Sequence, residues 1–236
     1  MCMPRWTVVV LTILLAMLCT TASQATLYFD GDFSSDWSFH LLAATVSYSR
    51  ELRADPDDYY LQVTTQPPEY WPCTAWAYFM KTSAVYDPQT MGAITSIDYS
   101  EEAISLQGWG AVQGTGPAIL QDGKYYFYGG GYTPLVTGLP LNEWRPLSAT
   151  GLQAGHFSLY GGPEFHPDLS AAGSPITFGF WRGTTAGGGT YVAGIDDWTI
   201  TVHDGANPTV PEPASLCLLS LAAGGIGTMV KRRKKA

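Results

Sequence analysis

The side chains that could carry out hydrolysis are few and poorly spaced for it. Glycoside hydrolysis needs two carboxylates that face one glycosidic bond. Glu101 and Glu102 are neighbours, so on a strand they face opposite sides, and Glu164 and Asp168 lack the alternation that would pair them. The histidines lie in no recognisable serine or cysteine motif, and no Gly-x-Ser-x-Gly occurs. We therefore expect no catalytic residues, and a glycoside hydrolase is the remotest alternative.

Aromatic rings in loops are the better candidates for contact with a ligand. Flat aromatic faces can stack on pyranose rings, but aromatic residues also fill sandwich cores and pair across strands. Trp71 lies in a proline-rich stretch, and Trp109 falls outside the regular strands. We predict that Trp71 and Trp109 bind carbohydrate, with a structural role as the alternative.

Two aspartates near the ends of the folded region could hold a cation. Asp30 begins a run that offers carboxylate oxygens at alternating positions. Asp196 shares its strand phase with Trp198 and Ile200, so in a regular strand it points toward the apolar face. A buried carboxylate needs a hydrogen-bond donor, a cation or a metal as its partner. For both residues the alternative to a metal is a hydrogen bond from backbone amides.

The elements that must position these residues are strands. Glycine and proline are frequent and charges are sparse, and no long stretch has helical periodicity. Asp122-Gly123 supplies the positive φ angles of a two-residue hairpin turn. About ten short strands predict an all-β, two-sheet antiparallel sandwich. The predicted strands are 26–29, 37–41, 59–64, 74–80, 93–99, 118–121, 124–128, 156–160, 176–181 and 195–202, whereas 50–58 is either a helical turn or a loop.

The first and last of these strands resemble those of concanavalin- and laminin-G-like jelly rolls. The resemblance rests on Phe29-Asp30-Gly31-Asp32-Phe33 and on the run from Gly194 to Val202, and Phe178 to Arg182 is similar to the penultimate strand. It implies a jelly roll whose terminal strands pair, of a kind found in secreted carbohydrate-binding modules. Related jelly rolls hold a structural calcium with acids on these strands, so it also implies Ca²⁺ at Asp30 and Asp196.

The two ends of the chain read as targeting segments. Arg5, the apolar run 8–18 and the small residues up to Ala25 form a signal peptide, with cleavage expected after Ala25 or, alternatively, after Ala22. The apolar run 214–230 has about the minimum length for a transmembrane helix. The basic cluster behind it would hold that end in the cytoplasm. That cluster is Lys231, Arg232, Arg233, Lys234 and Lys235.

This C-terminal arrangement resembles the PEP-CTERM sorting signal of exported bacterial proteins. The motif is Val210, Pro211, Glu212 and Pro213, followed by the hydrophobic segment and the basic end. The resemblance implies an exosortase partner that removes the tail. The alternative is a permanent single-span anchor. If the exosortase removes the tail, the protein is membrane-anchored only transiently, and afterwards it lies at the cell surface or outside the cell.

Charge and length complete the prediction. The region 26–209 holds six Lys and Arg against nineteen Asp and Glu, a net charge of −13 that opposes binding to nucleic acid. We expect an exported, non-catalytic surface or matrix protein, with a carbohydrate-binding module that contacts exopolysaccharide as the alternative. The expected division is a signal peptide 1–25, a β-sandwich 26–205, a linker 206–213, a transmembrane helix 214–230 and a basic tail 231–236.

Overall fold

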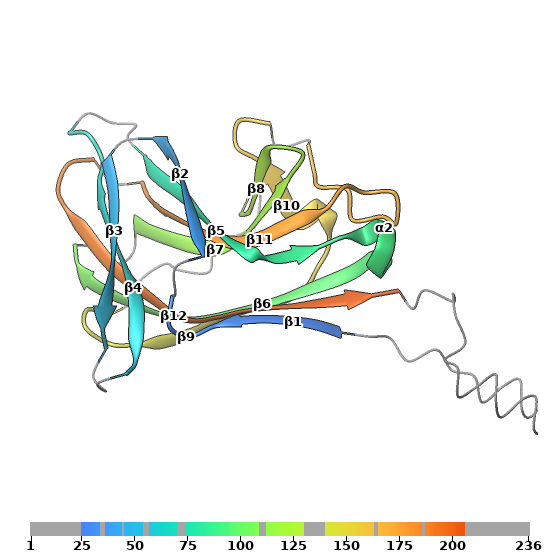
Figure 1. Ribbon diagram of the computed structural model, residues 1–236. Coiled ribbons are helices and arrows are strands. Elements are labelled where there is room, and N and C mark those ends of the chain that lie inside the picture. Colours follow the sequence, from blue (N-terminus) through green and yellow to red (C-terminus); the bar gives the residue numbers. More distant parts are fainter. Residues whose placement is uncertain are drawn as a thin grey trace, which may run out of the picture. The chain divides into compact units, whose positions relative to one another are not determined.

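Two antiparallel sheets face each other across one hydrophobic core, as the computed structural model shows (Figure 1). It describes residues 25–33, 36–43, 45–53, 57–69, 74–108, 112–129, 140–162, 165–185 and 187–205. These ranges all lie in one compact unit, Ser23–Gly205. The prediction of an all-β, two-sheet sandwich is confirmed.

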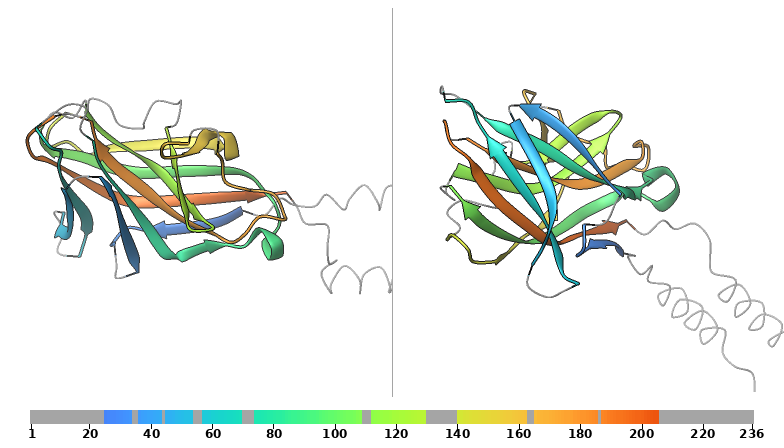
Figure 2. Two further views of the ribbon diagram at one scale, coloured as in Figure 1. Left: turned by 90° about the horizontal axis from the view of Figure 1, so that it is seen from above. Right: turned by 60° about the vertical axis from the view of Figure 1, so that its left-hand side comes forward.

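Sheet A has the strand order β3-β4-β12-β6-β9, and β1 also pairs with β12. Its strands are β1 Ala25–Asp30, β3 Thr45–Leu52, β4 Tyr59–Gln66, β6 Ile94–Gln107, β9 Arg145–Leu152 and β12 Tyr191–Asp204. β12 is central to this sheet, because its first half pairs with β4 and its second half with β1, while β6 follows it along the other side. Figure 2 shows the two long strands β6 and β12 running together through the layer.

Sheet B has the order β10-β8-β7-β11-β5-β2. Its strands are β2 Trp37–Ala43, β5 Ala75–Tyr86, β7 Gln113–Gln121, β8 Lys124–Tyr128, β10 Phe157–Leu159 and β11 Ile176–Thr184. The helical elements among the described residues are short, namely α2 Pro88–Met91 and the 3-10 turn Ala154–His156. Within the described ranges, no helix is long and apolar enough to cross a membrane, and the predicted helix 214–230 lies outside those ranges.

The terminal strands pair as the jelly-roll resemblance implied. β1 and β12 are antiparallel, with Ala25 opposite His203 and Asp30 opposite Trp198. The hairpin between β7 and β8 also forms at Asp122 and Gly123, whose φ angles are 52° and 72°. The hairpin follows from local sequence, since a two-residue turn needs positive φ angles, whereas the β1–β12 pairing joins the two ends of the domain.

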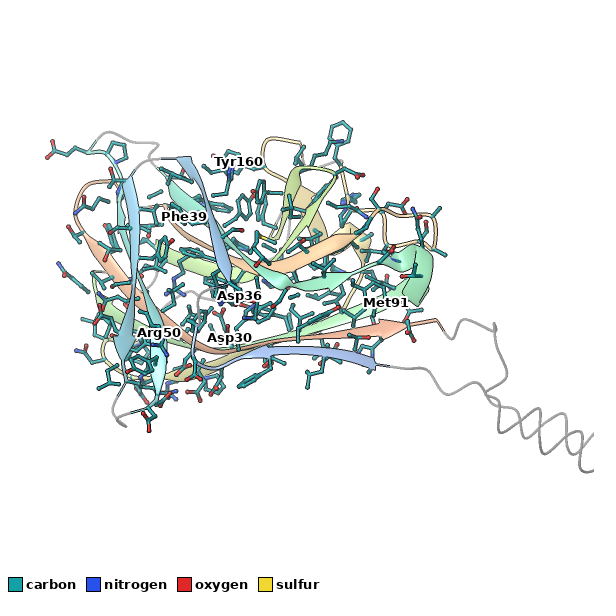
Figure 3. All side chains as sticks on the ribbon, viewed as in Figure 1. Asp30, Asp36, Phe39, Arg50, Met91 and Tyr160 are labelled. Atoms are coloured by element: carbon teal, nitrogen blue, oxygen red, sulfur yellow. The ribbon has the colours of Figure 1, made fainter. Side chains whose placement is uncertain are left out.

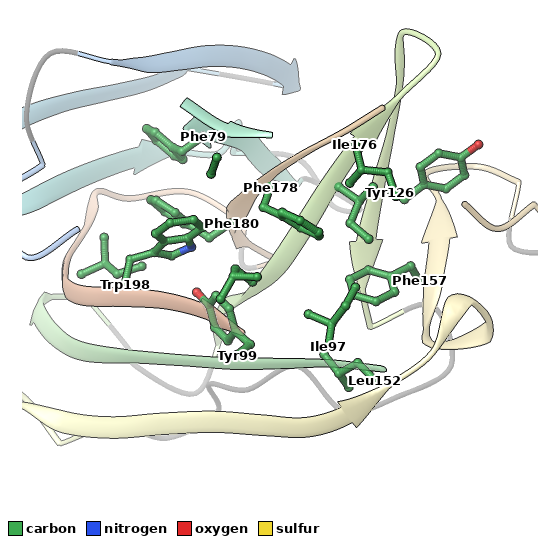
Figure 4. Packing of buried hydrophobic residues seen from close by; sticks show 14 of the residues in the cluster. Phe79, Ile97, Tyr99, Tyr126, Leu152, Phe157, Ile176, Phe178, Phe180 and Trp198 are labelled. Atoms are coloured by element: carbon green, nitrogen blue, oxygen red, sulfur yellow. The ribbon is translucent and has the colours of Figure 1, made fainter. Parts of the chain in front are cut away.

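The core lies between the sheets and is rich in aromatic rings (Figure 4). Phe79 of β5 and Phe180 of β11 are stacked, with ring centroids 4.8 Å apart. Trp198 of β12 is fully buried and meets the ring of Trp37 edge to face, at 5.1 Å between centroids. Ile97, Ile200 and Val202 fill the sheet A side. Burial of these side chains is the main driving force for the sandwich.

Candidate functional site

Sheet B carries a second apolar layer on the face that points away from the core. Along β5, Ala77 and Phe79 belong to the core, whereas the alternate residues Tyr78 and Met80 belong to a separate cluster with Trp181 of β11. Since successive side chains of a strand point to opposite faces, this cluster lies on the outer side of sheet B. We call it the aromatic face. Its other members are Trp76, Phe127 and Tyr125, with Leu42, Ala118 and Leu120 packed among them.

Two tryptophans form the centre of the aromatic face. The indoles of Trp76 and Trp181 are stacked, with centroids 4.3 Å apart and planes at 10°. Glycine makes room for both rings. A Cβ at Gly183 would lie 2.6 Å from Nε1 of Trp76, and a Cβ at Gly116 would lie 3.0 Å from Nε1 of Trp181. Glycine at these two positions therefore leaves the space that the stacked indoles occupy.

A second group of rings lies beside the indoles. His40 of β2 stacks on Tyr125 of β8 at 4.2 Å, and Tyr78 stacks on the same Tyr125 at 5.0 Å. Tyr160 contacts Trp76 at 5.6 Å and is 44% exposed. Figure 3 places Tyr160 on the side of sheet B that faces away from sheet A. His40, Tyr125, Trp76 and Tyr160 thus present ring surface to solvent, over a buried base of Tyr78 and Trp181.

Polar atoms on this face are only partly satisfied. Nε1 of Trp181 donates a hydrogen bond to the carbonyl oxygen of Tyr128 at 2.9 Å. Nε1 of Trp76 and the hydroxyl of Tyr78 are buried without a hydrogen-bond partner among the described residues. Burial raises the pKa of Tyr78, so its hydroxyl stays protonated and remains a donor. The face therefore presents ring surface suited to stacking, whereas its unpaired donors are buried beneath the rings.

The structure describes only some of the predicted site residues. Trp71 and Trp109 lie outside the described residues, as do Val210 to Pro213 and Lys231 to Lys235. Asp30 and Asp196 are described. Trp76, Tyr78 and Met80 lie together on one face of β5, but no sequence pattern selected them as a site. Alternation alone could not, because both faces of that strand carry apolar side chains.

Asp30 is held by amides and a lysine. Its Oδ1 accepts hydrogen bonds from the backbone amides of Asp32 at 3.0 Å and Phe33 at 2.8 Å, and its Oδ2 from Trp37 Nε1 at 2.9 Å. Lys81 Nζ lies 2.5 Å from the same Oδ2 and 2.6 Å from Oδ1 of Asp36, which Figure 3 shows near Asp30. Burial alone would raise the pKa of Asp30, but these hydrogen bonds bring it below its ordinary value.

Asp196 points away from the core, so the predicted inward phase is wrong. Asp197 has a positive φ of 48°, and the register of β12 against β6 shifts between Asp196 and Thr199. This β-bulge reverses the phase, so Asp196 lies opposite Glu102 on the outer side of sheet A. Nη1 of Arg53 binds Asp196 at 2.7 Å, and Nη2 binds Glu102.

Both aspartates thus have a cationic side chain as partner. Among the described residues no group of three or more His, Cys, Asp or Glu side chains could hold a metal ion. Calcium at Asp30 and Asp196 stays a prediction, and it requires the ion to share these carboxylates with Lys81 and Arg53. Its test is a fall in melting temperature when a chelator is added.

Comparisons with known proteins bear on both the tail and the sandwich. Residues 209–234 match the PEP-CTERM protein-sorting motif. No curated protein matches the chain. The chain is similar to the family 11 carbohydrate-binding module from Clostridium thermocellum, described in complex with a beta-1,3-1,4-mixed-linked tetrasaccharide. The two share 11% identity over 76% of this chain and 96% of that module, with a TM-score of 0.41.

Two further solved structures are similar at the same level. The CBM22-1 xylan-binding domain of Paenibacillus barcinonensis Xyn10C shares 10% identity over 78% of this chain and 99% of that one, with a TM-score of 0.42. An exo-beta-agarase shares 12% identity over 79% of this chain and 26% of its own, with a TM-score of 0.43. Since the tail matches in motif, order and position, this chain carries the PEP-CTERM sorting signal of exosortase-sorted surface proteins, attached to a β-sandwich domain.

Proposed function

We propose that this surface protein is non-catalytic and contacts extracellular polysaccharide through the aromatic face of sheet B. The observation that carries the proposal is the stacked indoles of Trp76 and Trp181, packed over two glycines, with part-exposed rings around them. Sugar rings present flat C–H faces that stack on aromatic rings, and their hydroxyls take up donors and acceptors nearby. Most ligand sites likewise combine apolar surface with a few placed polar groups.

The sorting signal supports the same reading. A PEP-CTERM tail directs a protein to the outside of the cell, where polysaccharide is the abundant polymer. On sheet A, the carboxylates of Asp196 and Glu102 are engaged with Arg53. A surface role without any small ligand is the competing function, and it is favoured by the deep burial of Tyr78 and Trp181.

A glycan array with the full chain in detergent separates the two functions. We expect binding to polysaccharide, weakened about tenfold or more by Tyr160→Ala and by Tyr125→Ala, since base or sugar stacking on one ring contributes on the order of 1–3 kcal/mol. Phe29→Ala is the matched control, because Phe29 is 58% exposed but lies on β1 of sheet A. Trp71→Ala and Trp109→Ala test the two loop residues predicted from sequence.

The melting temperature of each variant must be measured alongside binding. Lost binding with an unchanged melting temperature supports the aromatic face as the site. Absence of binding to every glycan contradicts the proposal and leaves the structural role. Equal loss in Phe29→Ala also contradicts it, because the effect would then not belong to sheet B.

A further inference from the structure

One pair of opposite charges lies inside the sandwich. Glu101 of β6 and Arg182 of β11 are each only 2% exposed. Arg182 shares its strand face with the core residues Phe178 and Phe180, so its side chain is directed between the sheets. Tyr99, two residues before Glu101 on β6, is likewise a core residue, and Figure 4 shows it between the sheets. The two charges therefore approach the interior from opposite sheets.

The pair is not in direct contact. No oxygen of Glu101 lies within 4.0 Å of a nitrogen of Arg182, so the two side chains form no ion pair. Glu101 uses only one oxygen, since Oε2 accepts from the hydroxyl of Tyr99 and, at 3.3 Å, from Oγ1 of Thr115. Glu101 Oε1 and both Nη atoms of Arg182 are buried without a hydrogen-bond partner among the described residues.

Three open hydrogen-bonding positions on two buried charges would cost several kcal/mol if they stayed open. Trp198 Nε1 in the core is likewise buried without a hydrogen-bond partner among the described residues, but other buried polar groups of the interior are paired. Thr65 and Thr184 share a hydrogen bond of 2.7 Å between the sheets, and Gln113 donates to Ser105 at 3.0 Å. The open positions are thus concentrated on Glu101 and Arg182, which still attract each other electrostatically.

The chemistry of the open positions selects the ligand. It must accept hydrogen bonds from the guanidinium and donate one to a carboxylate oxygen. A halide or similar small anion can accept from Arg182 but has no hydrogen to donate to Glu101, and a metal cation is repelled by Arg182. A water molecule both accepts and donates, and one water can bridge groups whose heavy atoms are roughly 4.5 Å apart. Buried waters typically occupy polar sites of this kind, with about three hydrogen bonds each.

We propose that Glu101 and Arg182 form an internal water-binding site between the two sheets, in which at least one ordered water bridges Glu101 Oε1 to the guanidinium. The site joins β6 of sheet A to β11 of sheet B through a polar link. It completes the hydrogen bonding of both charges without bringing them into contact. It lies directly behind the aromatic face, because Arg182 follows Trp181 in β11 and the hydroxyl oxygen of Thr115 also lies 3.1 Å from the carbonyl oxygen of Trp181.

A high-resolution crystal structure of the exported protein tests the site directly. We expect density for a water within hydrogen-bond distance of Glu101 Oε1 and of an Nη atom of Arg182. A bromide soak distinguishes the ligand, since an anion site would give an anomalous peak beside Arg182. Such a peak contradicts the proposal, and so does a direct Glu101–Arg182 contact with no density between the two groups.

Oxygen-17 magnetic relaxation dispersion of the full chain in detergent provides a second measurement, because it counts waters with long residence times. We expect Arg182→Met to lose at least one such water. Glu102→Gln is the matched control, since Glu102 is the neighbour of Glu101 on the opposite face and binds Arg53. An unchanged count in a folded Arg182→Met variant contradicts the proposal. If that variant does not fold, the wild-type crystal density decides.

Discussion

At the scale of single residues, Glu101 is a carboxyl group whose charge is strongly changed by the fold. Burial raises its pKa to about 7, and this effect exceeds the opposing attraction of Arg182 and the hydrogen bonds from Tyr99 and Thr115. These three residues are the charged and polar groups that the described residues bring to the carboxyl group. Tyr99 stays neutral, because burial raises the pKa of its hydroxyl as well.

Stability should therefore depend on pH through Glu101. Its pKa is higher in the folded state than its ordinary value of 4.5, so the folded state takes up a proton. The stabilising contribution is complete below pH 4.5 and is lost as the pH rises through about 7. The shift corresponds to about 3 kcal/mol. We expect the free energy of unfolding in urea to be larger at pH 5 than at pH 8.

Glu101→Gln tests this assignment, because glutamine keeps the shape but cannot titrate. Its free energy of unfolding should change much less between pH 5 and pH 8 than that of the wild type. Glu102→Gln should keep the wild-type dependence. A slope that survives in Glu101→Gln would assign the proton uptake to another group.

At the scale of strands, a strand could be predicted from sequence where burial gives it a marked alternation of apolar and polar residues. The strands with strong alternation were placed correctly, including β1 and β12 and the hairpin at Asp122 and Gly123. β3 and β9 were missed, and they are the two edges of the order β3-β4-β12-β6-β9. In β3 and β9 most side chains are partly or fully exposed, so these two sequences lack a marked apolar period.

Whether the orientation of a candidate side chain was predicted correctly depended on the regularity of its strand. The phase of Asp196 was wrong because a single bulge at Asp197 reverses alternation, and a bulge leaves no clear trace in composition. The opposite orientation of Glu101 and Glu102 was predicted correctly, because β6 is regular at that point. The pairing of Glu101 with Arg182 could not be predicted, since it depends on how two sheets face each other rather than on any local pattern.

The packing of the Trp76 indole over Gly183 of β11 gives a prediction at the scale of an element. Gly183→Ala adds a Cβ that would lie 2.6 Å from Nε1 of Trp76, so the indole must move off the strand. Overpacking of this kind typically costs about 1–3 kcal/mol. We expect a lower melting temperature and a changed near-ultraviolet circular dichroism signal from the stacked Trp76 and Trp181.

Gly155→Ala is the matched control for that substitution. A Cβ at Gly155 meets nothing within 4 Å and its φ is not positive, so it should leave both signals unchanged. Weaker glycan binding in Gly183→Ala, with the fold retained, would also connect the indole stack to the proposed site. Identical melting temperatures for the two variants would show that Trp76 does not lie on Gly183.

At the scale of the whole molecule, the distribution of charge and the tail belong together. The region 26–209 carries a net charge of −13, whereas five cations are gathered at 231–235. The acidic sandwich would be repelled by an anionic lipid surface, and the basic end would be attracted to one. Removal of the tail would therefore release a strongly acidic protein from the membrane.

The sorting motif makes that removal a testable expectation. Residues 209–234 match the PEP-CTERM motif, in which Pro211 and Pro213 favour the extended backbone that a protease cleft accepts. We expect mass spectrometry of the surface or medium form to end near Pro211-Glu212-Pro213, without the peptide Lys231–Lys235. Replacing Glu212 by Ala should leave more of the chain in the membrane fraction, whereas Glu143→Ala, at an exposed acid of the sandwich, should not. Recovery of the intact basic end from the wild-type surface form would instead show that the helix is a permanent anchor.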